Sequence, residues 1–112
     1  MIKVTIKLSA QTGVEQFEMI GHADSGPYGQ DIVCAAASVL AINTINSVEQ
    51  IAGVKPETRM DEDNGGLLTA KFPKVSNRDQ LLQMQAILKS FVIGMQDVAR
   101  NYSQFIKINI QN

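Results

Sequence analysis

The chain has 112 residues, of which 45% are hydrophobic, and this fits one globular domain with a modest core. Ten basic and eleven acidic residues give a formal net charge of −1 without any run of Lys or Arg, so we expect no nucleic-acid partner. The N-terminus does not have the pattern of a secretion signal, and one cysteine cannot form an internal disulfide. The expected compartment is therefore the reducing cytoplasm.

Two strands are predicted at the start of the chain. Residues 2–8 alternate apolar and polar side chains, which is the period of a strand with one buried and one solvated face. Turn-forming residues at 11–13 lead into a second strand over 14–22, in which Phe17 and Met19 share a face. The two strands should form a hairpin.

A long apolar helix is predicted next. Asp31 is a good N-capping residue, no Gly or Pro interrupts residues 32–52, and Gly53 then ends the helix. The uncharged stretch 32–48 is long enough to raise the question of a membrane span, yet its Ser, Thr and Asn side chains favour a buried helix and no membrane partner. Apolar residues lie nearly all round this helix, so it should pack against more than the sheet.

A second hairpin and a second helix are predicted in the second half of the chain. Residues 54–61 and 67–72 read as strands around a turn at 62–66, and Pro56 makes the first of them an edge strand. Ser76 and Asn77 precede an amphipathic helix that should end near residue 100, with apolar residues at three- and four-residue spacing: Leu81, Met84, Leu88, Phe91, Met95 and Val98.

Residues 106–110 alternate Ile with polar side chains and predict a fifth strand. The order is thus ββαββαβ, which is an α+β fold. No repeat, low-complexity tract or linker divides the chain, so residues 1–112 are expected to form a single domain.

The only cysteine, Cys34, and the only histidine, His22, lie twelve residues apart across a Gly-rich segment between the second strand and the first helix. A lone Cys in an apolar helix is usually a small buried hydrophobe, and a lone His is usually structural. Their joint placement favours chemistry, because a thiol needs a base to become a good nucleophile at neutral pH. With Asp31 as cap, Cys34 would lie in the first helical turn, where N–H groups favour a thiolate and can hold an oxyanion.

Two polar neighbours are candidates for supporting roles. Asp31 either orients and charge-stabilises His22 or simply caps the helix. Ser38 lies one turn after Cys34 and either hydrogen-bonds within the site or bonds back to its own helix.

The Gly-rich segment itself is either an ordinary turn or a lid that closes on an extended substrate. Glycines permit the backbone change that a lid needs, and an aromatic ring can pack on the ligand. The residues expected to form this substrate loop are Gly21, Ala23, Gly26, Tyr28 and Gly29.

Metal and nucleotide sites are not predicted. The acidic turn at 61–66 resembles a calcium loop only faintly, because Phe72 stands where the bidentate Glu should be. The sequence has no CxxC for zinc, and no phosphate-binding glycine motif. We therefore predict no metal and no cofactor.

Two separated motifs resemble those of one family. Residues 21–23 (Gly-His-Ala) and 31–38 (Asp-Ile-Val-Cys-Ala-Ala-Ala-Ser) look like the paired signature of the bacterial ribosomal-processing cysteine protease Prp family. Length and element order agree over the whole chain, although Ala37 stands where a larger aliphatic residue is common in the family. Carried over by position, the resemblance implies that Cys34 is the nucleophile and His22 the base, with Asp31 and Ser38 in supporting positions.

The resemblance also implies a structure and a substrate. It implies a homodimer whose protomer lays two helices on one side of a five-stranded sheet, with the active cleft between the first helix and the second strand. The implied substrate is the short N-terminal extension of a large-subunit ribosomal protein.

The predicted reaction is endoproteolysis through a thioester on Cys34, with His22 as general base. The alternatives are a non-catalytic ribosome-assembly module that grips an extended peptide, and a thiol redox sensor; turnover separates them. Because one sheet face cannot cover a helix that is apolar all round, self-association as a homodimer is also predicted from the residues.

Overall fold

The computed structural model describes residues 1–22 and 30–112 of the chain. Strands β1 (Ile2–Ser9) and β2 (Gly13–Ile20) form the predicted antiparallel hairpin. Helix α1 (Gln30–Ser47) follows and continues through one π-helical turn, η1 (Val48–Ala52). The first strand pair and the long helix are therefore confirmed.

The second half begins with strand β3 (Glu57–Asp61), which a short 3₁₀ turn, η2 (Asp63–Gly65), connects to β4 (Leu67–Lys71). Helix α2 (Arg78–Asn101) and strand β5 (Ile106–Gln111) complete the chain. The predicted order ββαββαβ is confirmed.

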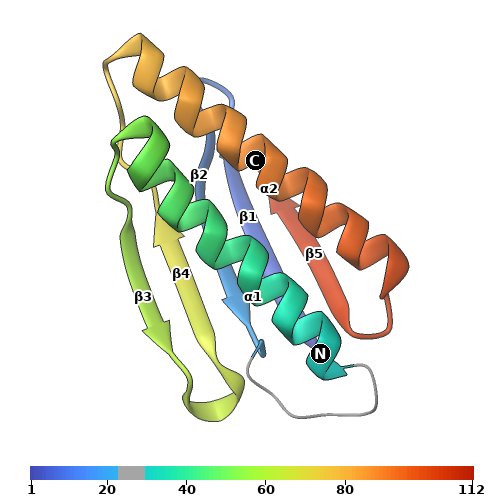
Figure 1. Ribbon diagram of the computed structural model, residues 1–112. Coiled ribbons are helices and arrows are strands. Elements are labelled where there is room, and N and C mark those ends of the chain that lie inside the picture. The colour runs from blue at the N-terminus through green and yellow to red at the C-terminus, as the bar shows by residue number, and fades with distance from the viewer. Residues whose placement is uncertain (23–29) are drawn as a thin grey trace.

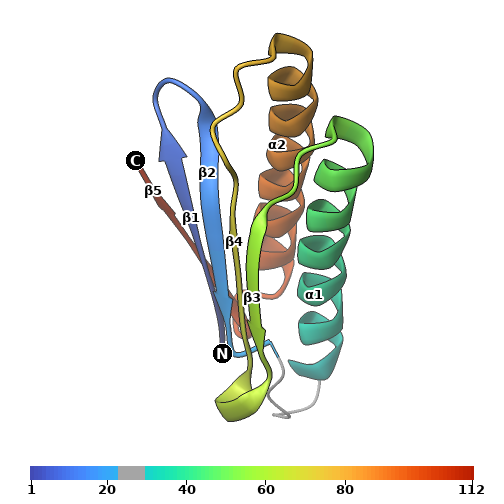
Figure 2. The ribbon, with the colours of Figure 1, turned by 90° about the vertical axis from the view of Figure 1, so that its left-hand side faces the viewer.

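The five strands form one mixed sheet in the order β3-β4-β2-β1-β5. Strand β5 runs parallel to β1, and the other neighbours are antiparallel. Both helices cover the same face of this sheet and leave the other face open (Figures 1 and 2). The molecule is thus a two-layer α+β fold with β3 as one edge strand, as Pro56 predicted.

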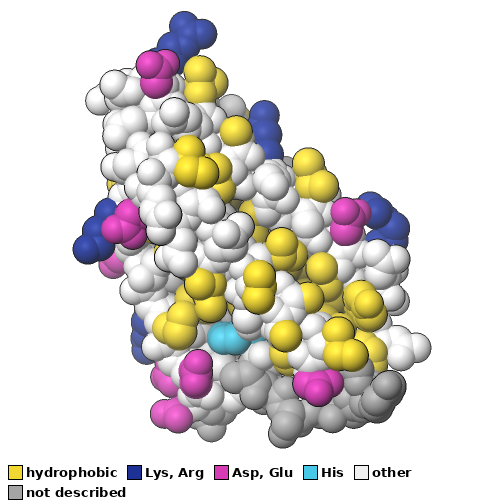
Figure 3. Space-filling view, viewed as in Figure 1, with side chains coloured by type: hydrophobic (Ala, Val, Ile, Leu, Met, Phe, Trp, Pro, Cys, Tyr) yellow, Lys and Arg dark blue, Asp and Glu magenta, His cyan; other side chains and the backbone are white. Residues whose placement is uncertain are grey.

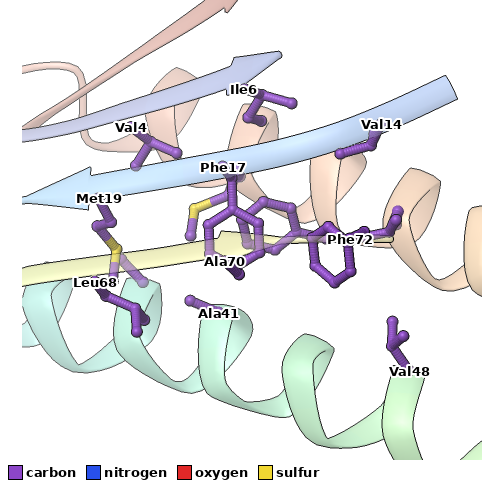
Figure 4. Packing of buried hydrophobic residues seen from close by; sticks show 14 of the residues in the cluster. Val4, Ile6, Val14, Phe17, Met19, Ala41, Val48, Leu68, Ala70 and Phe72 are labelled. Carbon is purple, nitrogen blue, oxygen red and sulfur yellow. The ribbon is translucent and has the colours of Figure 1, made fainter. Parts of the chain in front are cut away.

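The core lies between the helices and the covered face of the sheet, where apolar residues of β1, β2 and β4 alternate inward (Figure 4). Phe17 of β2 is its centre, with its ring 4.4 Å from the stacked ring of Phe91 and 5.9 Å from that of Phe72. Helix α2 contributes long side chains to this core: Met84, Leu88, Phe91 and Met95.

Two of the three predicted capping residues lie at the helix ends as expected, and the third does not. Asn77 caps α2 by accepting a hydrogen bond from the Gln80 N–H at 3.0 Å. Gly53 ends η1 in the left-handed conformation at φ 69°, which glycine adopts without strain. The prediction that Asp31 caps α1 is wrong, because the helix already begins at Gln30 and Asp31 lies within its first turn.

Two strand boundaries also differ from the prediction. Strand β2 ends at Ile20 rather than at residue 22, because Gly21 turns the backbone out of the sheet at φ 89°. Strand β3 begins at Glu57, directly after Pro56, which has no N–H to donate to a ladder.

The helical segment Gln30–Ala52 is long and apolar enough to cross a membrane by length and composition alone. The core helix of a globular protein passes the same test, and here one side of the segment packs into the core. The buried apolar residues of the segment are Val33, Cys34, Ala37, Ala41, Val48 and Ala52.

Candidate active site

The backbone at Gly21 fixes the place of His22. The Gly21 N–H donates a hydrogen bond to the Gly66 carbonyl at 2.9 Å, which ties the end of β2 to the start of β4. A Cβ atom at Gly21 would lie 2.7 Å from the carbonyl oxygen of Met1, and the φ of 89° is itself unfavourable for other residues. Glycine is therefore required at this position, and the residue after it is held at the end of the sheet.

His22 is buried, with 9% of its surface exposed. Its Nδ1 atom has no hydrogen-bond partner within the described residues. Figure 3 shows the histidine side chain reaching the surface of the helix-covered face, with hydrophobic side chains around it. A buried ring nitrogen without a partner is costly in a purely structural role and is available to exchange a proton.

Cys34 lies one helical turn into α1, and its thiol points back toward the end of β2. The Sγ atom donates a weak hydrogen bond to the Gly21 carbonyl over 3.9 Å. The structure thus brings Cys34 into contact with Gly21, the residue directly before His22. Cys34 and His22 lie twelve residues apart in the sequence. The thiol is largely shielded from solvent, with 7% of the residue exposed.

The backbone N–H of Cys34 is not one of the unpaired helix-start groups that were expected to hold an oxyanion. Cys34 is the fifth residue of α1, so in a regular helix its N–H is bonded to the carbonyl of Gln30. The difference arises because the helix begins at Gln30. If Asp31 were the cap, Cys34 would lie in the first turn and its N–H would be unpaired.

The predicted supporting residues lie in different environments. Asp31 is exposed, and its Oδ1 accepts a hydrogen bond at 3.1 Å from the N–H of Ile32, its neighbour, rather than from His22. Ser38 is partly buried one turn after Cys34, on the same side of α1. The substrate-loop residues Ala23, Gly26, Tyr28 and Gly29 lie outside the described residues.

One polar neighbour of the thiol was missed by the sequence interpretation. Gln30 has 3% of its surface exposed, and its Nε2 donates to the Cys34 Sγ atom over 4.0 Å. The signal was its spacing, since a residue four positions before Cys34 lies on the same side of the helix.

These features define a class of protein. A buried thiol that receives an amide N–H and contacts the backbone carbonyl directly before a buried histidine is compatible with a thiol hydrolase, a class of enzyme in which a histidine serves as base for a cysteine.

Comparison with known proteins gives the particular family. The family model for cysteine protease Prp matches residues 1–107, so the chain belongs to the Prp family of cysteine proteases. The ribosomal processing cysteine protease Prp of Bacillus subtilis is 30% identical over 108 residues, covering 96% of both chains. That of Staphylococcus aureus is 32% identical over 109 residues, covering 97% of this chain and 98% of its own.

Solved structures show the same fold. A crystal structure of a Streptococcus mutans protein superposes with a TM-score of 0.89 at 33% identity, over 99% of this chain and 94% of that one. The S. aureus Prp in complex with a substrate peptide superposes with a TM-score of 0.86 at 29% identity, over 99% of this chain and 100% of that one. The predicted family, fold and enzyme class are therefore confirmed, and the chain is a cysteine protease.

Proposed function

We propose that this protease removes the N-terminal extension of a large-subunit ribosomal protein, with Cys34 as nucleophile and His22 as base. The observation that carries the assignment is the Cys34 thiol, held against the Gly21 carbonyl next to the buried His22. The relatives are named ribosomal processing proteases, and the S. aureus enzyme has been solved with a substrate peptide and with a covalently linked product peptide.

The reaction proceeds by acyl transfer. His22 takes the proton of the Cys34 thiol, and the thiolate attacks the scissile carbonyl to form a tetrahedral oxyanion. The C–N bond breaks, His22 gives its proton to the leaving amine, and the N-terminal fragment remains on Cys34 as a thioester. Water, deprotonated by His22, then attacks the thioester and releases the new carboxyl end together with the restored thiol.

Asp31 and Ser38 keep supporting roles in this proposal. Ser38 follows Cys34 by one turn on the same side of α1, which supports a role for its hydroxyl near the nucleophile. Asp31 is exposed at the start of the same helix, three residues before Cys34, and its role is to help orient His22. Each role predicts a smaller effect on cleavage than that of Cys34 or His22.

An uncovered part of the helix side offers room for an extended peptide. Met60 of β3 is the register partner of Leu68 in β4, so both side chains lie on the covered face of the sheet. Leu68 is 1% exposed, whereas Met60 is 53% exposed because the helices leave the edge strand open (Figure 1). Strand β3, which carries Met60, leads into the turn that ends at Gly66, and the Gly66 carbonyl accepts the hydrogen bond from the Gly21 N–H. Gly21 in turn contacts the thiol, so a peptide that lies beside Met60 would continue toward Cys34.

The same protease is proposed to act in the cytoplasm as a homodimer. Large apolar side chains are exposed on both helices, and hydrophobic residues gather over this face in Figure 3. The exposed residues are Ile32, Val39 and Ile42 on α1 and Leu82 and Ile93 on α2. Sedimentation equilibrium at micromolar concentration tests the dimer, and a single species at the 12.2 kDa chain mass would refute it.

The function is tested by mass spectrometry of candidate large-subunit ribosomal proteins incubated with the enzyme. We expect one cut that shortens the N-terminus, and no cut with the Cys34→Ala variant. A protein that binds the extension with unchanged mass would instead support the non-catalytic assembly module. Equal cutting by Cys34→Ala would assign the activity to another residue or to a contaminant.

A further inference from the structure

We propose that the side chain of Gln30 is a catalytic residue of this site, donating its amide N–H to the sulfur and then to the oxyanion. The inference rests on the proposed acyl transfer at Cys34. It assigns a role to a buried polar group that neither the sequence motifs nor the names of the relatives identify.

The position of Gln30 in the helix gives the first argument. Gln30 begins α1 and Cys34 follows one turn later, so the side chains of both residues lie on one side of the helix. The Cys34 N–H is bonded within the helix and cannot serve as an oxyanion donor without breaking its bond to the Gln30 carbonyl. The carboxamide of Gln30 is the side-chain N–H donor that the described structure places on Sγ, over 4.0 Å.

The burial of Gln30 gives the second argument. Gln30 is 3% exposed, and taking a carboxamide out of water costs free energy unless its groups find partners. Glutamine is seldom fully buried, and a position that served packing alone would favour an apolar residue of similar length. Burial also strengthens the interaction of the amide with a negative charge, because less solvent screens it.

The chemistry of the step fits the two N–H groups of a primary amide. When the thiol loses its proton to His22, the negative charge on Sγ shortens and strengthens the hydrogen bond from Nε2. When the C–S bond forms, the charge moves to the carbonyl oxygen, where a second N–H of the same amide can donate. No other reactant is needed, since Gln30 is neither protonated nor deprotonated in the cycle.

The test uses two variants in which the side chain at position 30 keeps about the same length, and one matched control variant. Gln30→Met keeps the apolar volume and removes the donor, and Gln30→Glu keeps the shape but places a carboxylate beside the sulfur. Thr44→Val is the control, because Thr44 is another buried polar residue of α1, 4% exposed, and its hydroxyl donates to the Leu40 carbonyl at 2.7 Å. Circular dichroism of all three variants establishes that the fold is retained.

The first readout is the rate of iodoacetamide alkylation of Cys34 as a function of pH, which needs no substrate. We expect the pH midpoint to rise by about one unit in Gln30→Met and by more in Gln30→Glu, because the thiolate loses its donor and then gains a like charge. Thr44→Val should match the wild type. Identical midpoints in all four proteins would overturn the proposal.

The second readout is peptide cleavage. Loss of one oxyanion donor should lower kcat about 100-fold in Gln30→Met with little change in KM. An unchanged kcat, or a change confined to KM, would contradict the role. If the wild type cleaves nothing, the proposed function fails, whereas the alkylation profile still decides whether Gln30 stabilises the thiolate. If Gln30→Met does not fold, the same two readouts on Gln30→Glu decide the question.

Discussion

The two helices lie side by side on one sheet, yet they meet it with different side chains. Helix α1 buries small residues such as Ala37 and Ala41, together with the polar Gln30 and Thr44. Helix α2 buries only long apolar residues: Met84, Leu88, Phe91 and Met95. Small side chains let the backbone of α1 approach the sheet closely, and this brings its first turns to the end of β2.

This difference assigns the catalytic site to α1 and most of the core packing to α2. At the start of α1 the thiol lies within hydrogen-bonding reach of both the carboxamide of Gln30 and the backbone carbonyl of Gly21. Helix α2 instead fills the volume over Phe17 and contributes no polar side chain to the buried core among its described residues. Changes in α1 near Cys34 should therefore abolish turnover while the fold persists, and core changes in α2 should do the reverse.

The largest effect is expected at the start of α1 and at His22. Cys34→Ala and His22→Ala should each lower kcat/KM by a factor of about 10⁴ or more, because the first lacks the nucleophile and the second lacks the base. Both positions tolerate a small residue, so circular dichroism should show the native fold. Cleavage of a substrate peptide is the assay, and retained cleavage by Cys34→Ala would end the protease assignment.

The second effect is expected in α2. Phe91→Ala should cost about 3–5 kcal/mol of the free energy of unfolding, because it leaves a cavity beside the stacked ring of Phe17. Denaturant unfolding measures this loss, and kcat per folded molecule should stay within a few-fold of the wild type. The neighbouring exposed residue gives the control, since Lys89→Ala should leave stability nearly unchanged. A loss of kcat at full folding would mean that α2 also contributes to chemistry.

The smallest effect is expected on strand β3, outside both helices. Met60→Glu should lower kcat/KM for a peptide with apolar residues about tenfold, since it replaces an exposed apolar contact by a charge. Arg59→Glu is the matched control, because the adjacent residue of a strand points to the opposite, open face of the sheet. Steady-state kinetics of both variants compare the two faces. Equal losses in the two would argue against a peptide on the helix side.

The sequence predicted most of the fold because periodicity and turn residues are local signals. Alternation in β1 and β5 and the three- and four-residue spacing in α2 each reflect one buried face, and Asn77 and Gly53 marked helix ends through their own chemistry. Helix α1 was harder to interpret, since its apolar residues lie nearly all round and give no direction to the sheet.

The site was predicted in part for a related reason. His22 and Cys34 stood out as the only residues of their kinds, and the structure brings Cys34 to the residue before His22. Gln30 carried no such distinction, because a glutamine at a helix start is ordinary until burial and the contact with Sγ are known. Asp31 was assigned as a cap from residue type, whereas the helix begins one residue earlier.

The most direct test of covalent chemistry at the start of α1 is product analysis in the presence of hydroxylamine. A thioester on Cys34 partitions between water and hydroxylamine, so the N-terminal fragment of a cleaved peptide should carry a hydroxamate in a fraction that rises with hydroxylamine concentration. Mass spectrometry distinguishes this end group from a free carboxyl group. Cleavage that yields only the free carboxyl end at every hydroxylamine concentration would show that water attacks the peptide bond directly, and would contradict the assignment of Cys34 as nucleophile.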